Sequence, residues 1–393
     1  MIGAGGVGAA AAGIAARRDF FDTFVVADYD KAKAEAAVPD DRFRSEHVDA
    51  SSADEVTALC REHGITHVLN AVDPRFVMPI FEGALAAGAD YLDMAMSLSQ
   101  PDGVMLGDLQ FAAADEWARN GRLALVGIGV EPGLSDVFAR YAADHLFSRI
   151  DEVGVRDGGN LVVEGYDFAP SFSVWTTIEE CLNPPVIYEK GRGWYTTEPL
   201  SEPETFDFPG GIGPVECVHV EHEEVLLIPR WVDARKVTFK YALGSDFSDK
   251  LKTIHALGMD RTDKVAVKGS EVSPRDVLAA ITPDPISLGD KFRGRAIVGT
   301  WVLGTKDGKP RETFAYQMAD AEEVWAKHHL QVVGWQTGFN PTIAMELLAT
   351  NAWSGAGVLG PEAFDPDPYL GLLDLHGIHH AVVEMEPGAH RPT

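Results

Sequence analysis

Short apolar runs separated by helical patterns fill the first part of the chain, up to about residue 130. This alternation is typical of a parallel β-sheet whose strands are joined by crossover helices. The expected strands cover residues 25–28, 45–48, 66–72, 90–93 and 123–126. The expected helices cover residues 9–18, 52–63, 81–87 and 109–120. We therefore predict an α/β fold whose first domain, residues 1–130, is built on an open parallel sheet.

The pattern changes after about residue 150, where strand-like alternation dominates. Strands are expected at residues 152–156, 217–223, 226–228, 236–241 and 295–304. We assign residues 131–345 to an α+β domain with a mixed or antiparallel sheet.

Helical patterns return near the C-terminus, where Pro341 is expected to open a helix over residues 342–351. A loop at 355–361 and a helix at 367–376 follow. We expect this last segment, residues 346–393, to pack back on the first domain, with residues 388–393 frayed.

A glycine-rich run, Gly3-Ala4-Gly5-Gly6-Val7-Gly8, opens the first predicted helix. In a Gly-x-Gly-x-x-Gly motif the first glycine permits a tight turn, the second lets a pyrophosphate approach, and the third lets helix and strand pack closely. The helix N-terminus adds free N–H groups and the positive end of its dipole. We predict a Rossmann dinucleotide-binding domain; the alternative is a structural turn without a ligand. The predicted phosphate contacts are Gly3, Gly5, Gly6, Val7 and Gly8.

An acid at the end of the next strand, Asp28, indicates which dinucleotide binds. A carboxylate there accepts hydrogen bonds from the ribose hydroxyls and repels a 2′-phosphate. No arginine follows, since Tyr29, Asp30 and Lys31 come next, and arginine is the residue that matches phosphate geometry best. We therefore predict NAD, with NADP less favoured; capping of the next turn is the alternative role of Asp28.

Further cofactor contacts are expected where parallel strands end, because ligands of open α/β sheets lie at the carboxyl ends of the strands. The segments concerned are Asp49–Ala50, Asn70–Asp73, Asp93–Met96 and Gly127–Gly133. From them we predict cofactor contacts at Asp49, Ala50, Asn70, Ala71, Val72 and Asp73.

The first strand is unusually short, because only Met1 and Ile2 precede the first glycine. A buried parallel strand normally has about five or six residues. We expect the true chain to start upstream, although a stunted strand would give the same sequence.

Composition narrows the class of partner. The net charge of −27, from 60 acidic and 33 basic residues, disfavours binding to nucleic acid or anionic membranes. No apolar stretch approaches the roughly twenty residues needed to span a bilayer, and we expect no cleavable leader, because the N-terminal apolar residues belong to the glycine motif. Cys60, Cys181 and Cys217 lie too far apart for a disulfide framework or a zinc ribbon. We expect a cytoplasmic protein with a small-molecule substrate, no nucleic acid and no membrane partner.

Several runs together resemble the saccharopine dehydrogenase family, in the branch that also holds L-lysine 6-dehydrogenase and carboxynorspermidine dehydrogenase. The most specific is Gly127-Ile128-Gly129-Val130-Glu131-Pro132-Gly133, which is similar to that family's Gly-x-x-Pro-Gly loop before a helix. The N-terminal glycine run fits as well. Other similar runs are Asn70–Pro74, Gly88–Asp93, Gly158–Gly159, Ser173–Thr176, Phe208–Glu216 and Gly355–Glu362.

The resemblance implies hydride transfer at the carbon–nitrogen bond of an amino-acid-derived amine or imine. It also implies a homodimer, with residues 131–345 as the substrate-binding and dimerisation domain. Oxidative deamination of the ε-amine of L-lysine and carboxynorspermidine-type reductive condensation are alternative reactions. A dinucleotide-binding sensor without catalysis is an alternative of a different class, because the first strand is short and Met96 stands where some relatives have a tyrosine.

Two acids are the catalytic candidates that this resemblance suggests. Glu131, on the Pro-Gly loop, is the first choice for moving the amine proton; stabilising a helix N-terminus is its alternative role. Asp93 is the second choice, and capping of a loop is the alternative for it and for Asp73.

The candidate substrate contacts are an aromatic turn and several arginines. Trp175 and Thr176 resemble the family's substrate-facing turn, where helix N–H groups can receive a carboxylate; Trp175 as plain core is the alternative. Arg156, Arg230 and Arg235 are candidates for binding a carboxylate through two parallel hydrogen bonds, and the sequence does not select among them.

The run from His219 to Glu224 contains residue types that bind metals. On a strand, His219, Glu221 and Glu223 would share one face, and His222 and Glu224 the other. Two or three ligands on one face do not complete a metal site, and the implied reaction needs no metal. We therefore predict no metal, and a polar strand face near the substrate.

Overall fold

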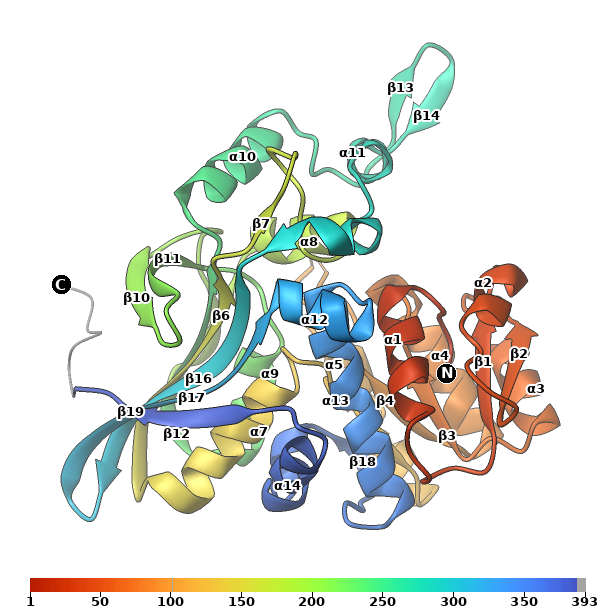
Figure 1. The fold of residues 1–393 in the computed structure, drawn as a ribbon, viewed down its shortest axis with the longest axis horizontal. Helices are drawn as coiled ribbons and strands as arrows, with labels where there is room; N and C mark the ends of the chain where they lie inside the picture. The colour runs from red at the N-terminus through yellow and green to blue at the C-terminus, as the bar shows by residue number, and fades with distance from the viewer. Residues whose placement is uncertain (101, 387–393) are drawn as a thin grey trace. The chain divides into compact units, whose positions relative to one another are not determined.

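The computed structural model describes residues 1–100 and 102–386, and it divides into two compact units (Figure 1). Unit 1 consists of Met1–His145, Leu226–Val232 and Gly334–His379. Unit 2 consists of Leu146–Val225, Asp233–Val333 and the residues from His380 on. These bounds differ from those expected at residues 130 and 345. Helix α7 (Leu134–Tyr141) stays with unit 1, where it contacts the short helix η4 (Pro361–Ala363).

Unit 1 contains a parallel sheet of the doubly wound type. Its named strands are β1 (Phe24–Asp28), β2 (Phe43–His47), β3 (His67–Asn70), β4 (Asp90–Asp93), β5 (Leu123–Leu125) and β18 (Gly357–Leu359). Ile2 forms parallel bridges to Ala27 of β1 and to Asn70 of β3. It therefore joins the pair β2–β1 to the series β3–β4–β5–β18, and the predicted α/β class is confirmed.

Helices connect these strands in the expected order. They are α1 (Gly6–Ala15), α2 (Lys31–Ala36), α3 (Ala53–Glu62), η1 (Pro74–Phe76), α4 (Val77–Ala87), α5 (Asp108–Ala112), α6 (Ala114–Arg119), η2 (Ala142–Leu146) and α14 (Asp367–Leu375). The single helix expected at 109–120 is therefore two short ones. The loop expected at 355–361 contains β18, which pairs with β5.

The expectation that Pro341 opens a helix is wrong, because Pro341 lies inside α13 (Val332–Ala349). A proline removes one helical hydrogen bond. Here the side chains of Asn340 and Thr342 donate to the carbonyl oxygens of Gln336 and Gly338, at 2.8 and 2.9 Å. Packing contributes as well, since a Cβ at Gly338 would lie 3.0 Å from that of Ala10 on α1.

Unit 2 contains a mixed sheet of nine strands, as the alternation predicts. Its main path runs β10 (Glu204–Phe208), β11 (Gly213–His219), β12 (Ala234–Ala242), β6 (Arg149–Gly159), β16 (Arg295–Lys306), β17 (Lys309–Asp320) and β19 (His380–Glu384). Two more strands, β8 (Val186–Glu189) and β9 (Gly193–Thr196), attach through β12. The pair β12–β6 is parallel, and the other pairs are antiparallel.

The described part of unit 2 also contains four helices and two small antiparallel strand pairs. The helices are α8 (Val174–Leu182), α10 (Ser245–Ala256), α11 (Pro274–Ile281) and α12 (Ala321–His328), with the short helix η3 (Pro285–Lys291). The pairs are β7 (Val162–Val163) with β15 (Phe292–Arg293), and β13 (Val265–Val267) with β14 (Ser270–Val272).

Two strand predictions fail around residue 220. Strand β11 ends at His219, and the apolar residues 226–228 belong to helix α9 (Glu224–Trp231). A short apolar run fits a buried strand or a buried helix equally well, and all three of these residues are almost fully buried. The residues from Glu221 to Glu224 therefore do not share the strand alternation that the sequence suggested.

Candidate functional site

The glycine turn of unit 1 is shaped by close backbone contacts. Gly3 has φ +103°, and a Cβ there would lie 2.4 Å from the carbonyl oxygen of Ala71. A Cβ at Gly8 would lie 2.1 Å from the carbonyl oxygen of Gly3. Beside Gly5, in contrast, a Cβ would meet no atom within 4 Å. Gly5 is the N-cap of α1, and no side chain caps this helix, as expected for a helix N-terminus that binds a pyrophosphate.

Asp28 ends β1 beside this turn. Its Oδ2 accepts a hydrogen bond from the N–H of Ala4 at 2.7 Å, and its Oδ1 accepts one from Asp30 at 2.8 Å. The carboxylate thus braces the glycine turn and remains partly exposed. Tyr29 next to it is largely exposed, and Lys31 is held by the carbonyl oxygen of Ser45.

The other predicted cofactor residues lie at strand ends, as expected. Asn70 ends β3, and its amide donates to the hydroxyl of Tyr91 at 2.9 Å and accepts from the N–H of Val72 at 3.1 Å. Asp49 accepts from Ser51, and Asp73 pairs with Arg75 and caps η1. Ala50 and Ala71 flank these turns.

Asp93 is buried and fully engaged with its neighbours. Its Oδ1 accepts from the N–H of Gly127 and its Oδ2 from the amide of Gln110, both at 2.7 Å. Its backbone carbonyl accepts from Ile128 at 2.7 Å. Asp93 therefore shapes the loop of residues 127–133 and positions the residues on it.

Glu131 lies on that loop and is partly exposed. The loop closes on itself, because the N–H of Gly129 donates to the carbonyl of Pro132 at 2.6 Å. Gly133 has φ +135°, and its N–H donates to Asp136, which is buried in the first turn of α7. This arrangement fixes the backbone on both sides of Glu131.

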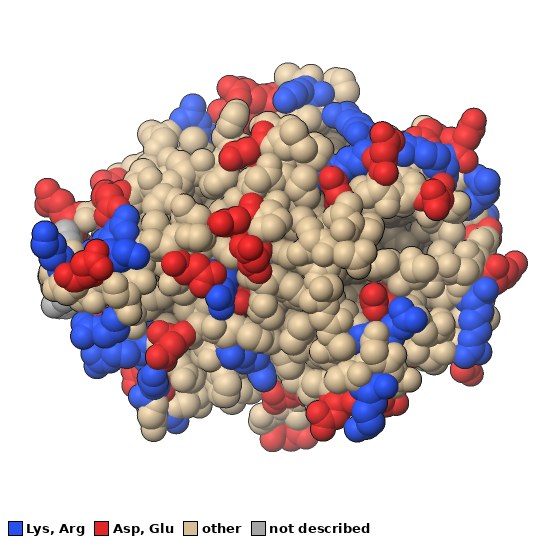
Figure 2. Space-filling view, turned by 90° about the horizontal axis from the view of Figure 1, so that it is seen from below, with Lys and Arg blue, Asp and Glu red and all other residues tan. Residues whose placement is uncertain are grey.

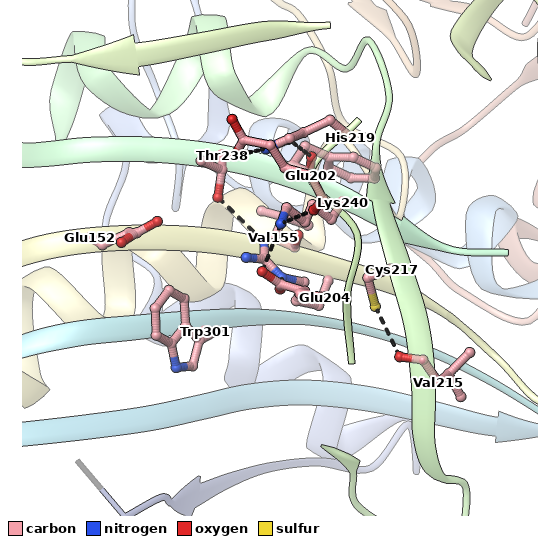
Figure 3. Close-up of polar contacts among 12 residues, drawn as sticks. Glu152, Val155, Glu202, Glu204, Val215, Cys217, His219, Thr238, Lys240 and Trp301 are labelled. Carbon is pink, nitrogen blue, oxygen red and sulfur yellow. Dashed lines mark hydrogen bonds and ion pairs between the residues drawn. The ribbon is translucent and has the colours of Figure 1, made fainter. Parts of the chain in front are cut away.

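Arg156 of unit 2 belongs to a buried ion cluster on one face of the sheet. Its Nε donates to Glu204 at 2.6 Å, and Lys240 donates to the same carboxylate at 2.7 Å. Figure 3 shows Glu204 and Lys240 facing each other beside Val155, with Trp301 on the neighbouring strand. Burial raises the pKa of Glu204, but the charges of Arg156 and Lys240 more than offset this and lower it, while burial lowers the pKa of Lys240. Arg156 thus ties the edge strand β10 to the sheet.

The remaining substrate candidates have contacts of their own within each unit. Arg230, in unit 1, stacks 3.7 Å from the ring centroid of Phe111, and its Nε donates to the carbonyl of Leu226. Trp175 is buried on α8 under Arg275, whose guanidinium lies 4.7 Å from the ring centroid. The N–H of Thr176 is capped by Ser173 at 3.3 Å.

A second buried cluster lies on the opposite face of the unit 2 sheet. We call it the acid cluster, and it consists of Asp157, Glu180, His222, Glu223 and Glu224. His222 is 2 % exposed and stacks on Phe239, with ring centroids 3.9 Å apart. Its Nδ1 bonds to Glu224 and lies 3.5 Å from Glu223. Helix α8 joins the cluster through the carbonyl of Glu180, which accepts from the N–H of Glu221 at 2.9 Å.

The protonation of the acid cluster follows from burial and from crowding of like charges. Burial, with the neighbouring carboxylates, raises the pKa of Glu180 to about 8. Burial raises the pKa of Asp157 to about 7, against the hydrogen bond from Tyr241 and the charge of His222. Burial lowers the pKa of His222, but Glu224, Glu223 and Glu180 more than offset this and raise it to about 10.

Sequence reasoning identifies three of the five residues of this cluster. The run from His219 to Glu224 stood out, but Asp157 and Glu180 did not, because nothing local distinguishes them from surface acids. His219 itself lies on the other face, where it contacts Glu202 and the carbonyl of Phe239. Burial beside Lys240 lowers the pKa of His219 to about 4.

Unit 1 combines a doubly wound sheet, a glycine turn without a side-chain cap and an acid at the end of the next strand. These features together define a dinucleotide-binding protein of the dehydrogenase type. Two family models match: "Saccharopine dehydrogenase NADP binding domain" over residues 1–125 and "Saccharopine dehydrogenase C-terminal domain" over residues 129–378. The chain belongs to the saccharopine dehydrogenase family.

Curated relatives cover nearly the whole chain. Carboxynorspermidine synthase of Vibrio alginolyticus is 30 % identical, over 99 % of this chain and 97 % of the relative. Carboxyaminopropylagmatine dehydrogenase of Synechocystis sp. is 29 % identical, over 98 % and 97 %. Apo saccharopine dehydrogenase (L-Glu forming) from Saccharomyces cerevisiae shares the fold, with a TM-score of 0.71 over 98 % of this chain and 99 % of that one, at 15 % identity.

These findings confirm the predicted family and the predicted activity class, an NAD(P)-dependent oxidoreductase acting on an amine or imine. They also confirm a nicotinamide dinucleotide as the cofactor, without choosing between NAD and NADP. Among the described residues, no helix is long and apolar enough to cross a membrane. On the face drawn in Figure 2, acidic and basic side chains are interspersed, without a continuous stripe of either sign.

Proposed function

We propose that the protein transfers hydride between NAD and the carbon–nitrogen bond that joins an amino-acid-derived carbonyl compound to an amine. The observation that carries this proposal is the likeness, along nearly the full chain, to relatives named for carboxynorspermidine and carboxyaminopropylagmatine. Both names describe amines that bear a carboxyl group. Saccharopine and L-lysine are the competing substrates within the same family.

Asp28 supports NAD over NADP. A 2′-phosphate would have to approach a carboxylate already braced by the N–H groups of Ala4 and Asp30. No arginine accompanies it, and Lys31 is engaged with Ser45 and Glu46. The matching family model is named for NADP, and we infer that this chain differs from it by binding NAD.

We assign the phosphates to the turn from Gly3 to Gly8, the ribose to Asp28, and the remaining dinucleotide contacts to the strand ends from Asp49 to Ala50 and from Asn70 to Asp73. A bound nicotinamide would supply or accept the hydride. Glu131 would move the amine proton, since it is the partly exposed carboxyl group of its loop. Asp93 would position that loop through Gly127. We also propose that the protein is a cytoplasmic homodimer. Light scattering, which measures the mass of the protein in solution, tests the dimer.

Turnover tests this proposal. Purified protein receives NAD or NADP with saccharopine, L-lysine or carboxynorspermidine at alkaline pH, and NADH or NADPH formation is followed. We expect NAD-dependent turnover with one of them, and a fall of about 100-fold in kcat for Glu131→Gln with unchanged KM for NAD. Silence with every amine, while NADH still binds, would favour the non-catalytic sensor.

A further inference from the structure

We propose that Tyr91 and Gln110 are positioning residues for the hydride transfer, because they hold the carboxylate of Asp93 and, through it, the loop of residues 127–133 that carries Glu131. Both side chains are fully buried, so they act through Asp93 rather than on the substrate. This inference rests on the proposed function and adds to it the residues that align the proton-transfer group with the dinucleotide.

Several donors converge on the buried carboxylate of Asp93. Its Oδ1 accepts from the N–H of Gly127 and its Oδ2 from Nε2 of Gln110, both at 2.7 Å. Tyr91 lies two residues before Asp93 on β4, so the two side chains share one face of the sheet, and the Tyr91 hydroxyl hydrogen-bonds to the carboxylate. A buried charge needs such donors to offset its lost hydration. The donors also fix where the carboxylate lies, and with it the start of the loop.

The direction of the hydrogen bonds around Tyr91 follows from the groups involved. Nδ2 of Asn70 donates to the hydroxyl oxygen of Tyr91 at 2.9 Å, and Oδ1 of the same amide accepts from the N–H of Val72 at 3.1 Å. A phenol has one proton to donate, and here Asp93 receives it. Burial and the neighbouring carboxylate raise the pKa of Tyr91 well above its ordinary value. The hydroxyl is therefore a fixed donor and not a catalytic acid.

Gln110 supports the same carboxylate from helix α5. Its Nε2 donates to Asp93, and its Oε1 accepts from the N–H of Ser97 at 2.8 Å. Both ends of the amide are thus engaged, and turning the side chain away would break two buried hydrogen bonds, which is costly. Asp93 is therefore held by its own strand and by a separate helix.

The series of contacts also reaches the turn that we assign to the cofactor. Asn70 ends β3, in register with Asp93 on β4. The turn after Asn70 lies against the glycine turn, since a Cβ at Gly3 would lie 2.4 Å from the carbonyl oxygen of Ala71. Continuous contacts thus join the dinucleotide turn to the loop of residues 127–133. Such alignment matters because a misplacement of about 1 Å can cost roughly a hundredfold in rate.

Plain packing is the competing role of Tyr91. Its ring lies beside those of Phe81 and Trp117, with centroids 5.3 and 6.2 Å away. Phenylalanine keeps the ring and loses only the hydroxyl, so Tyr91→Phe separates the two roles. Tyr369→Phe is the matched control, because Tyr369 is also fully buried in unit 1 and its hydroxyl donates to Asn340 on α13.

The test is a double-mutant cycle in turnover of the full chain with NAD and whichever of saccharopine, L-lysine and carboxynorspermidine it oxidises. Tyr91→Phe should lower kcat about tenfold with an unchanged KM for NAD, and Tyr369→Phe should change neither. In a Glu131→Gln background, Tyr91→Phe should lower kcat by less than about twofold, because the hydroxyl acts through Glu131. A purely structural effect would lower kcat by the same factor in both backgrounds.

Amide hydrogen exchange supplies a readout that needs no turnover. The loop of residues 127–133 is bonded to Asp93 through the N–H groups of its first two residues. Tyr91→Phe and Gln110→Met should each speed exchange in this loop at least about tenfold, whereas Tyr369→Phe should leave it unchanged. Gln110→Met also takes the place of Tyr91→Phe in the cycle if the latter does not fold.

A kcat of Tyr91→Phe within about twofold of the parent would overturn the inference, and so would an equal loss in the parent and Glu131→Gln backgrounds. Unchanged loop exchange in Tyr91→Phe and Gln110→Met would overturn it as well. The proposed function fails separately. If the parent oxidises none of the amines, exchange alone decides: faster exchange in both variants leaves their hold on the loop standing, and unchanged exchange removes it.

Discussion

At the scale of single residues, side chains adjacent in sequence belong to different buried clusters on the two faces of the unit 2 sheet. Arg156 and Lys240 pair across β6 and β12 on one face, within the buried ion cluster. Asp157 and Tyr241, one residue further along, pair on the other face, within reach of His222. This follows from the period of two along a strand. The sequence predicts the alternation, but only the fold decides that both faces are buried.

The acid cluster makes stability depend on pH. The pKa of Glu180 is about 8 in the folded chain, against an ordinary value of 4.5, so the folded state holds a proton that the unfolded state has lost. The stabilisation that this proton gives to the folded state is therefore fully present below about pH 4.5 and is lost as the pH rises through about 8. Glu180→Gln stays neutral at every pH. We expect this variant to exceed the parent in free energy of unfolding by on the order of 2–4 kcal/mol at about pH 9.

Urea unfolding from pH 4 to 9 measures this difference. It should be small at the acid end and grow with pH, and Glu216→Gln, a matched change at an exposed site on β11, should show no such trend. A difference that stays constant with pH would mean that Glu180 is not held neutral by its surroundings.

Cofactor choice is the second prediction at this scale. In Asp28→Asn with Tyr29→Arg, the amide oxygen can still accept from Ala4, while the negative charge is gone and a guanidinium is added. We expect the ratio of kcat/KM for NADP over NAD to rise at least tenfold, because repulsion of the 2′-phosphate is removed. Tyr29→Arg alone is the control and should shift the ratio less. An unchanged ratio in the double variant would show that Asp28 does not select the cofactor.

At the scale of elements, the unit 1 strands and the turns after them are largely predictable from sequence. Apolar runs bounded by turn residues give β1 to β5 within a few residues, and the glycine spacing marks the start of α1. The failures have physical causes. The short apolar run of helix α9 fits a strand equally well, and α13 continues through Pro341, where Asn340 and Thr342 add side-chain hydrogen bonds to carbonyl oxygens of the same helix.

The loop that carries Glu131 offers a prediction at the element scale. A Cβ at Gly133 would lie 2.1 Å from the carbonyl oxygen of Gly129, at φ +135°. We expect Gly133→Ala to destabilise the protein by on the order of 2–4 kcal/mol and to lower kcat. Gly13→Ala, in the last turn of α1 where a Cβ meets no atom within 4 Å, should instead stabilise by about 0.5–1 kcal/mol. Denaturant unfolding compares the two, and similar effects would contradict the geometry of the loop.

At the scale of the whole molecule, sequence pattern predicts the fold class, and family resemblance predicts the activity. The division into units is harder to predict, because unit 1 is assembled from three separate stretches and β19 returns to unit 2. The same limit applies to the site. The cofactor turn is local in sequence, whereas the acid cluster joins β6, α8 and α9 over more than sixty residues.

The central claim is that this chain moves hydride to or from a carbon–nitrogen bond. Its most direct test uses NADH carrying deuterium at the transferable position of C4, with an amino-acid-derived aldehyde and 1,3-diaminopropane as substrates. The account predicts a secondary amine with one deuterium on the carbon that has gained the nitrogen, and much less of it with Glu131→Gln. A protein that binds the labelled NADH and yields no deuterated amine with any aldehyde and amine pair would contradict it.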